Sequence, residues 1–241
     1  MKQGNTRREM TRRTFLASTA ALSAASCATV PHVVTGAAAA KTPANERLNL
    51  GAVGFGGMGA GNIRNLSGEQ FIALCDVDTE YAKPIFEAFP DARRYADYRE
   101  MLAAESDLDG VVIATPDHTH AVIAMAAIKA GKHVFCQKPL AHDVHECRML
   151  AQAAAEAGVV TQMGIQGHAG NGTRTVVECI QAGVIGEVRE VHAFCTDSYY
   201  PWGHESWSPK EGRVPEETVP VPDTLNWDLW LGPAAARPYH P

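Results

Sequence analysis

Cysteine is scarce and dispersed in this sequence. Six cysteines occur among 241 residues, and those after residue 40 are widely spaced and mostly inside apolar runs: Cys75, Cys136, Cys147, Cys179 and Cys195. This spacing excludes the dense pairing of a small disulfide scaffold, and no two cysteines have the spacing of metal ligands. We therefore expect buried free thiols and no metal site.

Basic residues are also fewer than acidic residues outside the N-terminal region. The chain has a formal net charge of −6. Its first forty residues hold five basic side chains and one acidic side chain, which leaves 16 basic against 26 acidic side chains in the rest. Because such a surface repels polyanions, we expect no nucleic-acid partner and no binding to an anionic membrane surface.

Long hydrophobic runs are absent as well. The apolar stretch at residues 16–26 is too short to span a bilayer, and it follows TRRTFL at residues 11–16, which resembles a twin-arginine export signal. We interpret residues 1–40 as a targeting segment and expect a periplasmic or otherwise exported protein whose soluble mature chain starts near Lys41. The alternatives are a lipoprotein cleavage site at residues 24–27 and a plain basic tail.

Short apolar runs alternate with amphipathic stretches from Leu48 onward. This alternation predicts strand and helix units with right-handed crossovers, and hence an α/β fold with an open, doubly wound parallel sheet. Strands are expected at residues 48–54, 71–76, 93–95, 110–115, 133–136 and 159–163. Helices are expected at residues 58–66, 79–88, 98–103, 119–130 and 144–157.

The pattern changes after residue 165. A helix is expected at about residues 172–182, followed by a glycine turn and a strand at 188–196, whereas the tail from Tyr199 onward shows no periodicity. We therefore expect a targeting segment (1–40), a nucleotide-binding domain (41–165) and the incomplete beginning of an α+β domain (166–241).

The most specific motif is a glycine-rich loop directly after the first strand. It reads G-x-G-x-x-G and comprises Gly54, Phe55, Gly56, Gly57, Met58 and Gly59. The glycines allow a tight turn, close approach of the backbone to a pyrophosphate and close packing of the next helix, whose N-terminus attracts the anion. The motif predicts a dinucleotide site.

Asp76 supports this interpretation. It ends the next strand, seventeen residues after Gly59, where a carboxylate accepts hydrogen bonds from the ribose hydroxyls of adenosine. A carboxylate there would repel a 2′-phosphate, and the residues that follow offer no arginine to hold one. We therefore expect NAD rather than NADP.

Two further strand ends carry polar residues. Ligands of open α/β sheets bind at such carboxyl ends. By itself the first segment is equally well a helix start with solvated histidines, but the two together favour a functional site. They comprise Thr115, Pro116, Asp117, His118, Thr119 and His120 in one segment, and Gln137, Lys138 and Pro139 in the other.

Taken together, these motifs resemble the Gfo/Idh/MocA family of dehydrogenases. The resemblance extends to Gln166 and to residues 174–186 and 225–239. It implies a Rossmann domain that binds NAD, followed by a domain for substrate binding and oligomerisation. The cofactor-binding residues that it implies are Gly54, Phe55, Gly56, Gly57, Met58, Gly59, Asp76, Thr115, Pro116, His118, His120, Gln137, Lys138 and Gln166.

The resemblance also implies the chemistry. Lys138 matches the lysine of the family's Glu-Lys-Pro motif, so it is expected to be catalytic, to hydrogen-bond the reacting hydroxyl and to help its proton leave. Arg174 is expected to contact the substrate together with Lys138. Gln137 replaces the glutamate of that motif, so no carboxylate precedes the lysine.

The family's Asp-x-x-x-His element, which usually supplies a catalytic histidine, would lie downstream of the segment WDLWLGP. No such element follows Tyr239. We therefore expect the second domain to continue beyond Pro241, and the resemblance implies a homo-oligomer for the full-length protein.

The expected function is that of an NAD-dependent oxidoreductase. It would transfer hydride between nicotinamide and a hydroxyl or ketone of a small, carbohydrate-like molecule: a sugar, a polyol or a glycoside. Two alternatives stay open. One is a glycosidase or epimerase that recycles NAD through oxidation and elimination, and the other is a non-catalytic nucleotide-binding module.

Overall fold

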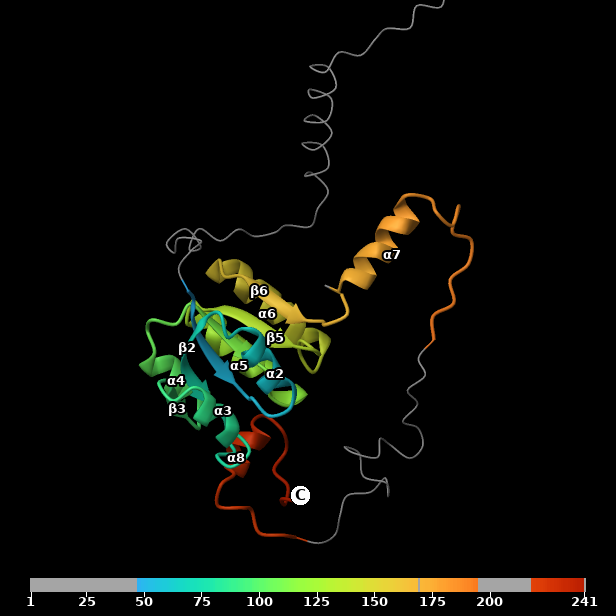
Figure 1. Ribbon diagram of the computed structural model, residues 1–241. Coiled ribbons are helices and arrows are strands. Elements are labelled where there is room, and N and C mark those ends of the chain that lie inside the picture. Colours follow the sequence, from blue (N-terminus) through green and yellow to red (C-terminus); the bar gives the residue numbers. More distant parts are fainter. Residues whose placement is uncertain (1–46, 169, 195–217, 241) are drawn as a thin grey trace, which may run out of the picture. The chain divides into compact units, whose positions relative to one another are not determined.

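The structure is a computed structural model that describes residues 47–168, 170–194 and 218–240 (Figure 1). The expected export signal, Cys195 and the beginning of the tail at Tyr199 lie outside these residues. Among the helices described, none is both long enough and apolar enough to cross a bilayer.

A six-stranded sheet forms the centre of the region from residue 47 to residue 165. Its strands are β1 (Asn49–Val53), β2 (Gln70–Cys75), β3 (Arg93–Tyr95), β4 (Gly110–Ile113), β5 (His133–Gln137) and β6 (Thr161–Gly164). They lie in the order β3-β2-β1-β4-β5-β6, and each neighbouring pair is parallel. The predicted doubly wound α/β fold is therefore confirmed.

The register of the strands aligns the loops that carry the expected site. Val53 pairs with Cys75 on one side and with Ile113 on the other, and Ile113 pairs with Cys136. The glycine loop, Asp76 and the segments after β4 and β5 therefore all leave the sheet at its carboxyl edge.

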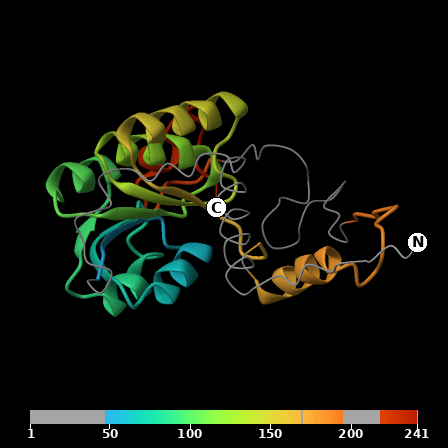
Figure 2. The ribbon, with the colours of Figure 1, turned by 90° about the horizontal axis from the view of Figure 1, so that it is seen from above.

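Helices cover both faces of this sheet, as Figure 2 shows. On one face α2 (Met58–Asn65) and α3 (Lys83–Ala88) bury Ile63, Ile85 and Phe86 against the strands. On the other face α4 (Tyr98–Ala104), α5 (His120–Lys129) and α6 (Val144–Ala157) bury a second cluster that includes Met101, Ile128 and Leu150. Strands that are apolar on both faces are typical of such a sheet.

Local signals explain several helix ends. The Asp143 side chain accepts a hydrogen bond from the Glu146 N–H over 2.8 Å at the start of α6, and Gly158 ends this helix in the left-handed conformation with φ 65°. The expected helix at 79–88 begins only at Lys83, because the backbones of Asp78 and Thr79 pair with residues near the C-terminus instead.

The region after residue 165 differs from the sequence-based expectation. The expected helix is present as α7 (Asn171–Gln181), and Gly183 and Gly186 turn with positive φ. The expected strand at 188–196 is wrong over its described part, residues 188–194, where Val191 and Phe194 are exposed. A strand needs a partner to satisfy its N–H and C=O groups, and the described residues provide none here.

Candidate functional site

A cavity of about 580 Å³ opens at the carboxyl edge of the sheet. It spans the point between β1 and β4 at which the strand order reverses, the usual ligand site of open α/β sheets. The structure brings together here six residues that the sequence predicted for the cofactor: Gly54, Gly56, Gly57, Asp76, Thr115 and Pro116.

Two glycines of the loop have no room for a larger residue. A Cβ atom on Gly54, which has φ 75°, would lie 2.8 Å from the backbone nitrogen of Thr115. A Cβ atom on Gly59 would lie 2.3 Å from the carbonyl oxygen of Gly54. These contacts confirm the turn and the close helix packing that the motif predicted.

The two larger residues of the motif do not line the cavity. Phe55 is buried and packs edge-on against Phe86 at 5.2 Å between ring centroids, so it contributes to the site through its backbone. Met58 is 55% exposed and lies outside the lining of this cavity.

Asp76 is held in place by the backbone. Its two carboxylate oxygens accept hydrogen bonds from the N–H groups of Phe55 (3.0 Å) and Asp78 (3.1 Å). Burial raises the pKa of this carboxyl, and the hydrogen bonds from the backbone partly oppose that shift. Each oxygen retains a lone pair and Asp76 lines the cavity, so the pair of oxygens fits the two hydroxyls of a ribose.

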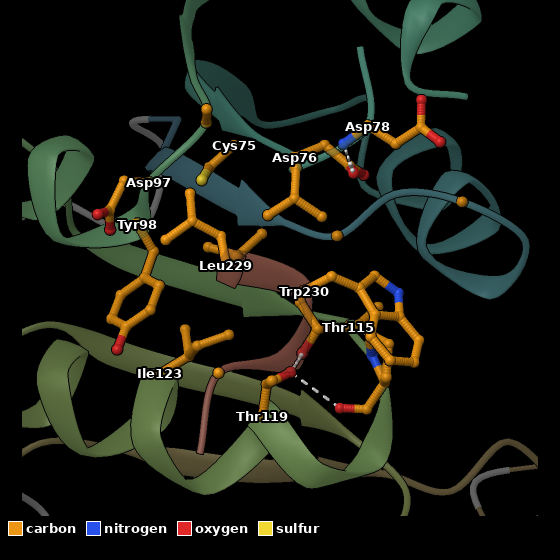
Figure 3. A pocket seen from close by; sticks show the side chains of 18 of the residues that line it. Cys75, Asp76, Asp78, Asp97, Tyr98, Thr115, Thr119, Ile123, Leu229 and Trp230 are labelled. Carbon is orange, nitrogen blue, oxygen red and sulfur yellow. Dashed lines mark hydrogen bonds between the residues drawn. The ribbon is translucent and has the colours of Figure 1, made fainter. Parts of the chain in front are cut away.

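The T-P-x-H-x-H segment closes the cavity on the side of β4 and forms the 3₁₀ helix η2 (Asp117–Thr119) and the start of α5. The hydroxyl of Thr119 lies 2.8 Å from that of Thr115 (Figure 3). His120 is buried, with Nε2 2.8 Å from the Thr115 carbonyl oxygen and Nδ1 2.6 Å from the Pro139 carbonyl oxygen. It thus links the segment after β4 to the segment after β5.

Three side-chain amides form a chain beside Lys138. The buried Gln137 donates from Nε2 to Asn62 Oδ1 (3.1 Å), and its Oε1 accepts from Gln166 Nε2 and from the Lys138 N–H, each at 3.3 Å. Lys138 is exposed and is joined to Pro139 by a cis peptide bond. Gln137, Lys138 and Gln166 therefore lie along the strand ends next to the cavity, outside its lining, as do His118 and His120.

Arg174 and the cysteines are the remaining residues that the sequence singled out. Arg174 lies on α7 with an exposed side chain, so its substrate role stays a prediction. The thiols of Cys75 and Cys136 are free and buried, and burial raises the pKa of Cys136 to about 12, which leaves it protonated and inert. Within the described ranges, no three His, Cys, Asp or Glu residues are grouped so that they could hold a metal ion.

The sequence did not single out several residues of the cavity wall. Some follow β3 or lie on α5, and others belong to α8 (Trp227–Leu231) and its flanks, in a tail that shows no periodicity. Only the similarity of residues 225–239 to the family pointed to this tail. These additional lining residues are Tyr98, Ile123, Leu225, Asp228, Leu229 and Trp230.

The strand order, the glycine loop and the orientation of Asp76 define a dinucleotide-binding Rossmann domain. Its donor and acceptor groups fit NAD, with backbone N–H groups near the pyrophosphate and a carboxylate for the ribose. Residues 48–165 match the model of the Gfo/Idh/MocA oxidoreductase family, described as having an NAD-binding Rossmann fold, and this domain belongs to that family. The predicted family and cofactor, NAD, are confirmed.

Known proteins of this family are similar over more of the chain. The inositol 2-dehydrogenase of Pseudomonas savastanoi pv. phaseolicola is 35% identical over 194 residues, which are 76% of this chain and 54% of that protein. That of Salmonella paratyphi B is 31% identical over 151 residues, which are 60% of this chain and 45% of that protein. The chain therefore spans about half the length of these curated relatives.

Solved structures show the same fold. The WlbA dehydrogenase of Bordetella pertussis, solved with NADH and UDP-GlcNAcA, has a TM-score of 0.53 and 26% identity over 57% of this chain and 44% of its own. An NAD binding oxidoreductase of Klebsiella pneumoniae has a TM-score of 0.51 and 35% identity over 59% of this chain and 40% of its own.

Proposed function

We propose that this protein is an NAD-dependent dehydrogenase that oxidises a hydroxyl of a polyol or sugar, or reduces the corresponding ketone. Relatives named inositol 2-dehydrogenase support a cyclic polyol as the first substrate to test, and WlbA supports a sugar derivative as the second. Both kinds of molecule carry the secondary alcohol that this reaction requires.

The double contact of His120 is the observation that carries this proposal. Through the carbonyl oxygens of Thr115 and Pro139, this histidine ties the loop of Lys138 to a residue that lines the cofactor cavity. The lysine is thereby anchored beside the dinucleotide site rather than elsewhere on the surface. Its exposed side chain is the amine that a reacting alcohol would meet there.

Different residues of the chain carry out different parts of the proposed reaction. The glycine loop and Asp76 bind and orient the cofactor, which when bound supplies the carbon that accepts hydride from the carbinol carbon. Lys138 Nζ hydrogen-bonds the alcohol oxygen and accepts its proton as the C–O bond becomes a carbonyl. Gln137 and Gln166 position the backbone that carries this lysine.

The first test is a calorimetric titration of the 241-residue chain with NAD and, separately, with NADP. We expect NAD to bind more tightly, and we expect the Asp76→Ala variant to lose most of that preference because the ribose carboxylate is gone. Failure of the folded chain to bind either nucleotide would overturn the proposal.

The second test measures NADH formation by the full-length protein from NAD with myo-inositol and with a panel of sugars. Replacing Lys138 by Met should lower the rate about 10² to 10⁴-fold with little change in NAD affinity, because it removes a proton acceptor and not a cofactor contact. Lys129→Met, at the exposed end of α5, is the matched control and should leave the rate unchanged.

The same assay separates the two alternatives. A glycosidase or epimerase that recycles NAD would form product without net NADH. A nucleotide-binding module would bind NAD tightly and convert none of these substrates. Either result would contradict the dehydrogenase proposal while leaving NAD binding intact.

Export through the twin-arginine route is a further part of the proposal. It rests on residues 11–16 alone. Replacing Arg12 and Arg13 by Lys should retain the protein in the cytosol of a bacterial host, as cell fractionation would detect. Unchanged distribution of the double variant would argue against this route.

A further inference from the structure

A segment near the C-terminus is bound to the ribose end of the cofactor cavity. We call residues 224–233 the strap. The strap backbone pairs with the residues directly after Asp76: the Asn226 N–H donates to the Val77 carbonyl oxygen over 2.8 Å, and the Thr79 N–H donates to the Thr224 carbonyl oxygen over 2.9 Å. An antiparallel bridge joins Asp78 to Leu225 between them.

The other end of the strap is bound to the segment after β4. His118 Nε2 lies 2.9 Å from the Trp230 carbonyl oxygen, and the two rings are 5.2 Å apart. Gly232, with φ 51°, packs against Thr119, where a Cβ atom would lie 3.1 Å from the threonine methyl group. The strap therefore crosses from the end of β2 to the end of β4 and is fixed on both sides.

Between these two anchors the strap forms helix α8, which turns side chains into the cavity. Asn226 caps the helix, since its Oδ1 accepts a hydrogen bond from the Leu229 N–H over 3.1 Å. Leu229 is half-buried and converges with Tyr98 and Ile123 on one part of the cavity (Figure 3). These three side chains give this part of the cavity an apolar wall, while Asp97, Arg99 and Asp228 add charged groups to the lining.

The position of Asp76 indicates which part of the cofactor would occupy this apolar part of the cavity. The ribose bound by Asp76 is joined to the pyrophosphate on one side, toward the glycine loop, and to its base on the other. The base must therefore lie within one sugar of Asp76, on the side away from Gly56, where the strap covers the cavity. A flat heteroaromatic ring suits a slot with an aromatic and two aliphatic walls.

We propose that the strap is a wall of the adenine subsite, with Leu229 packed against the adenine ring opposite Tyr98 and Ile123. This inference rests on the proposed binding of NAD. It makes residues near the C-terminus, which lie far along the chain from the glycine loop, determinants of cofactor affinity. His118 is then a positioning residue that holds the strap and does not touch the cofactor.

The test uses two variants of opposite size in the 241-residue chain. Leu229→Ala removes the packing surface, and Leu229→Trp fills the slot; neither alters a buried core residue, so both should fold. The probes are ADP-ribose, which carries the adenine without nicotinamide, and nicotinamide mononucleotide, which lacks the adenine. Val221→Ala is the matched control, because Val221 is an exposed aliphatic residue just before the strap and does not line the cavity.

Both Leu229 variants should raise the Kd of NAD and of ADP-ribose about tenfold or more, with nicotinamide mononucleotide and the control variant unaffected. An ADP-ribose Kd within twofold of wild type in both variants would overturn the assignment, as would tighter binding, which would mean that the strap competes with the cofactor. If either of these results is obtained and the wild-type chain does bind NAD, only the strap proposal fails. If it binds no nucleotide at all, the proposed function fails with it.

Discussion

The N–H of Phe55 donates to the Asp76 carboxylate over 3.0 Å. This bond joins the glycine loop to the residue that we propose binds the ribose, so the two halves of the expected adenosine-diphosphate site are not independent. A change in the loop moves the carboxylate, and a change in the carboxylate releases the loop. Pre-organisation of this kind reduces the ordering cost of binding a cofactor with many rotatable bonds.

Burial of Asp76 makes stability depend on pH. Its pKa is raised above the ordinary value of 3.8, chiefly by desolvation. As pH rises from 3.8 toward the raised pKa, the unfolded chain releases this proton while the folded chain keeps it, so the free energy of unfolding falls through that interval. The Asp76→Asn variant has no titratable group at this position, so its free energy of unfolding lacks this pH-dependent contribution.

Urea unfolding over a pH series would measure this effect. The free energy of unfolding of wild type, taken relative to Asp76→Asn, should decrease as pH rises through the interval and then stay level. The exposed Asp91 provides the control, since Asp91→Asn should track wild type at every pH. A wild-type advantage that grows with pH would contradict the raised pKa.

Two glycines of α2 should respond in opposite ways to the same substitution. Gly59→Ala places a methyl group 2.3 Å from the Gly54 carbonyl oxygen, so the loop must shift; we expect a loss of about 1 to 3 kcal/mol of stability and weaker NAD binding. A Cβ atom on Gly61 meets no atom within 4 Å. Gly61→Ala should therefore stabilise the protein by about 0.5 to 1 kcal/mol, through helix propensity.

Thermal unfolding and NAD titration of both variants would check this. Equal effects of the two substitutions would show that helix propensity, and not contact with the loop, governs this turn of α2.

The residues that could be predicted from the sequence are those whose role depends on local geometry. The glycine loop, Asp76 and the carboxyl ends of β4 and β5 follow from the periodicity of the strands and from the rule that ligands bind at that edge. The strands β1, β2, β4 and β5 were found because their residues form mostly apolar runs between turn residues, whereas β3 is a short, weaker candidate with two arginines. Right-handed crossovers between them then predicted an open, doubly wound sheet, and the structure supplied the strand order.

The parts that could not be predicted depend on distant partners. The strap has no period, and its contacts with Val77, Thr79 and His118 join segments that are far apart in the chain. The same pairing shortens α3 at its start. Residues 188–194 have strand-like composition but no strand to pair with among the described residues, and β propensity alone does not form a strand. Asn62 belongs to no sequence motif, and only the structure shows its contact with Gln137.

His120 should be important for stability as well as for the site. His120→Ala removes a buried ring and leaves the carbonyl oxygens of Thr115 and Pro139 without this contact, which we expect to cost about 2 to 4 kcal/mol. The released loop should also lower the rate of NAD reduction more than it lowers NAD affinity, because the loop carries Lys138. His145→Ala, at an exposed position on α6, should change neither.

Chemical denaturation and steady-state kinetics would separate these effects. Unchanged stability of the His120→Ala variant would show that the two carbonyl groups find other partners. A loss of NAD affinity equal to the loss of rate would place His120 in cofactor binding rather than in positioning the lysine.

Gln137 is the position at which the sequence departs from the family motif, and Gln137→Glu tests what the amide does. In the native chain Gln137 Nε2 donates to Asn62 Oδ1, while the buried Nδ2 of Asn62 has no hydrogen-bond partner in the structure. A carboxylate at position 137 would repel Asn62 Oδ1. A flip of the Asn62 amide group, which exchanges the positions of its oxygen and nitrogen, removes this repulsion. The free Nδ2 then donates to the new carboxylate, so we expect the variant to fold with stability within about 1 kcal/mol of wild type.

The electrostatic effect should appear in the kinetics. A carboxylate beside Lys138 stabilises the ammonium form of the lysine, which cannot accept the proton of the substrate alcohol. The dehydrogenase rate should therefore fall in Gln137→Glu, whereas NAD affinity stays the same. Glu156→Gln, a charge change on the exposed face of α6, is the control for a general effect of net charge. A rate that is unchanged in Gln137→Glu would show that the side chain at position 137 contributes only through its hydrogen bond to the Lys138 backbone.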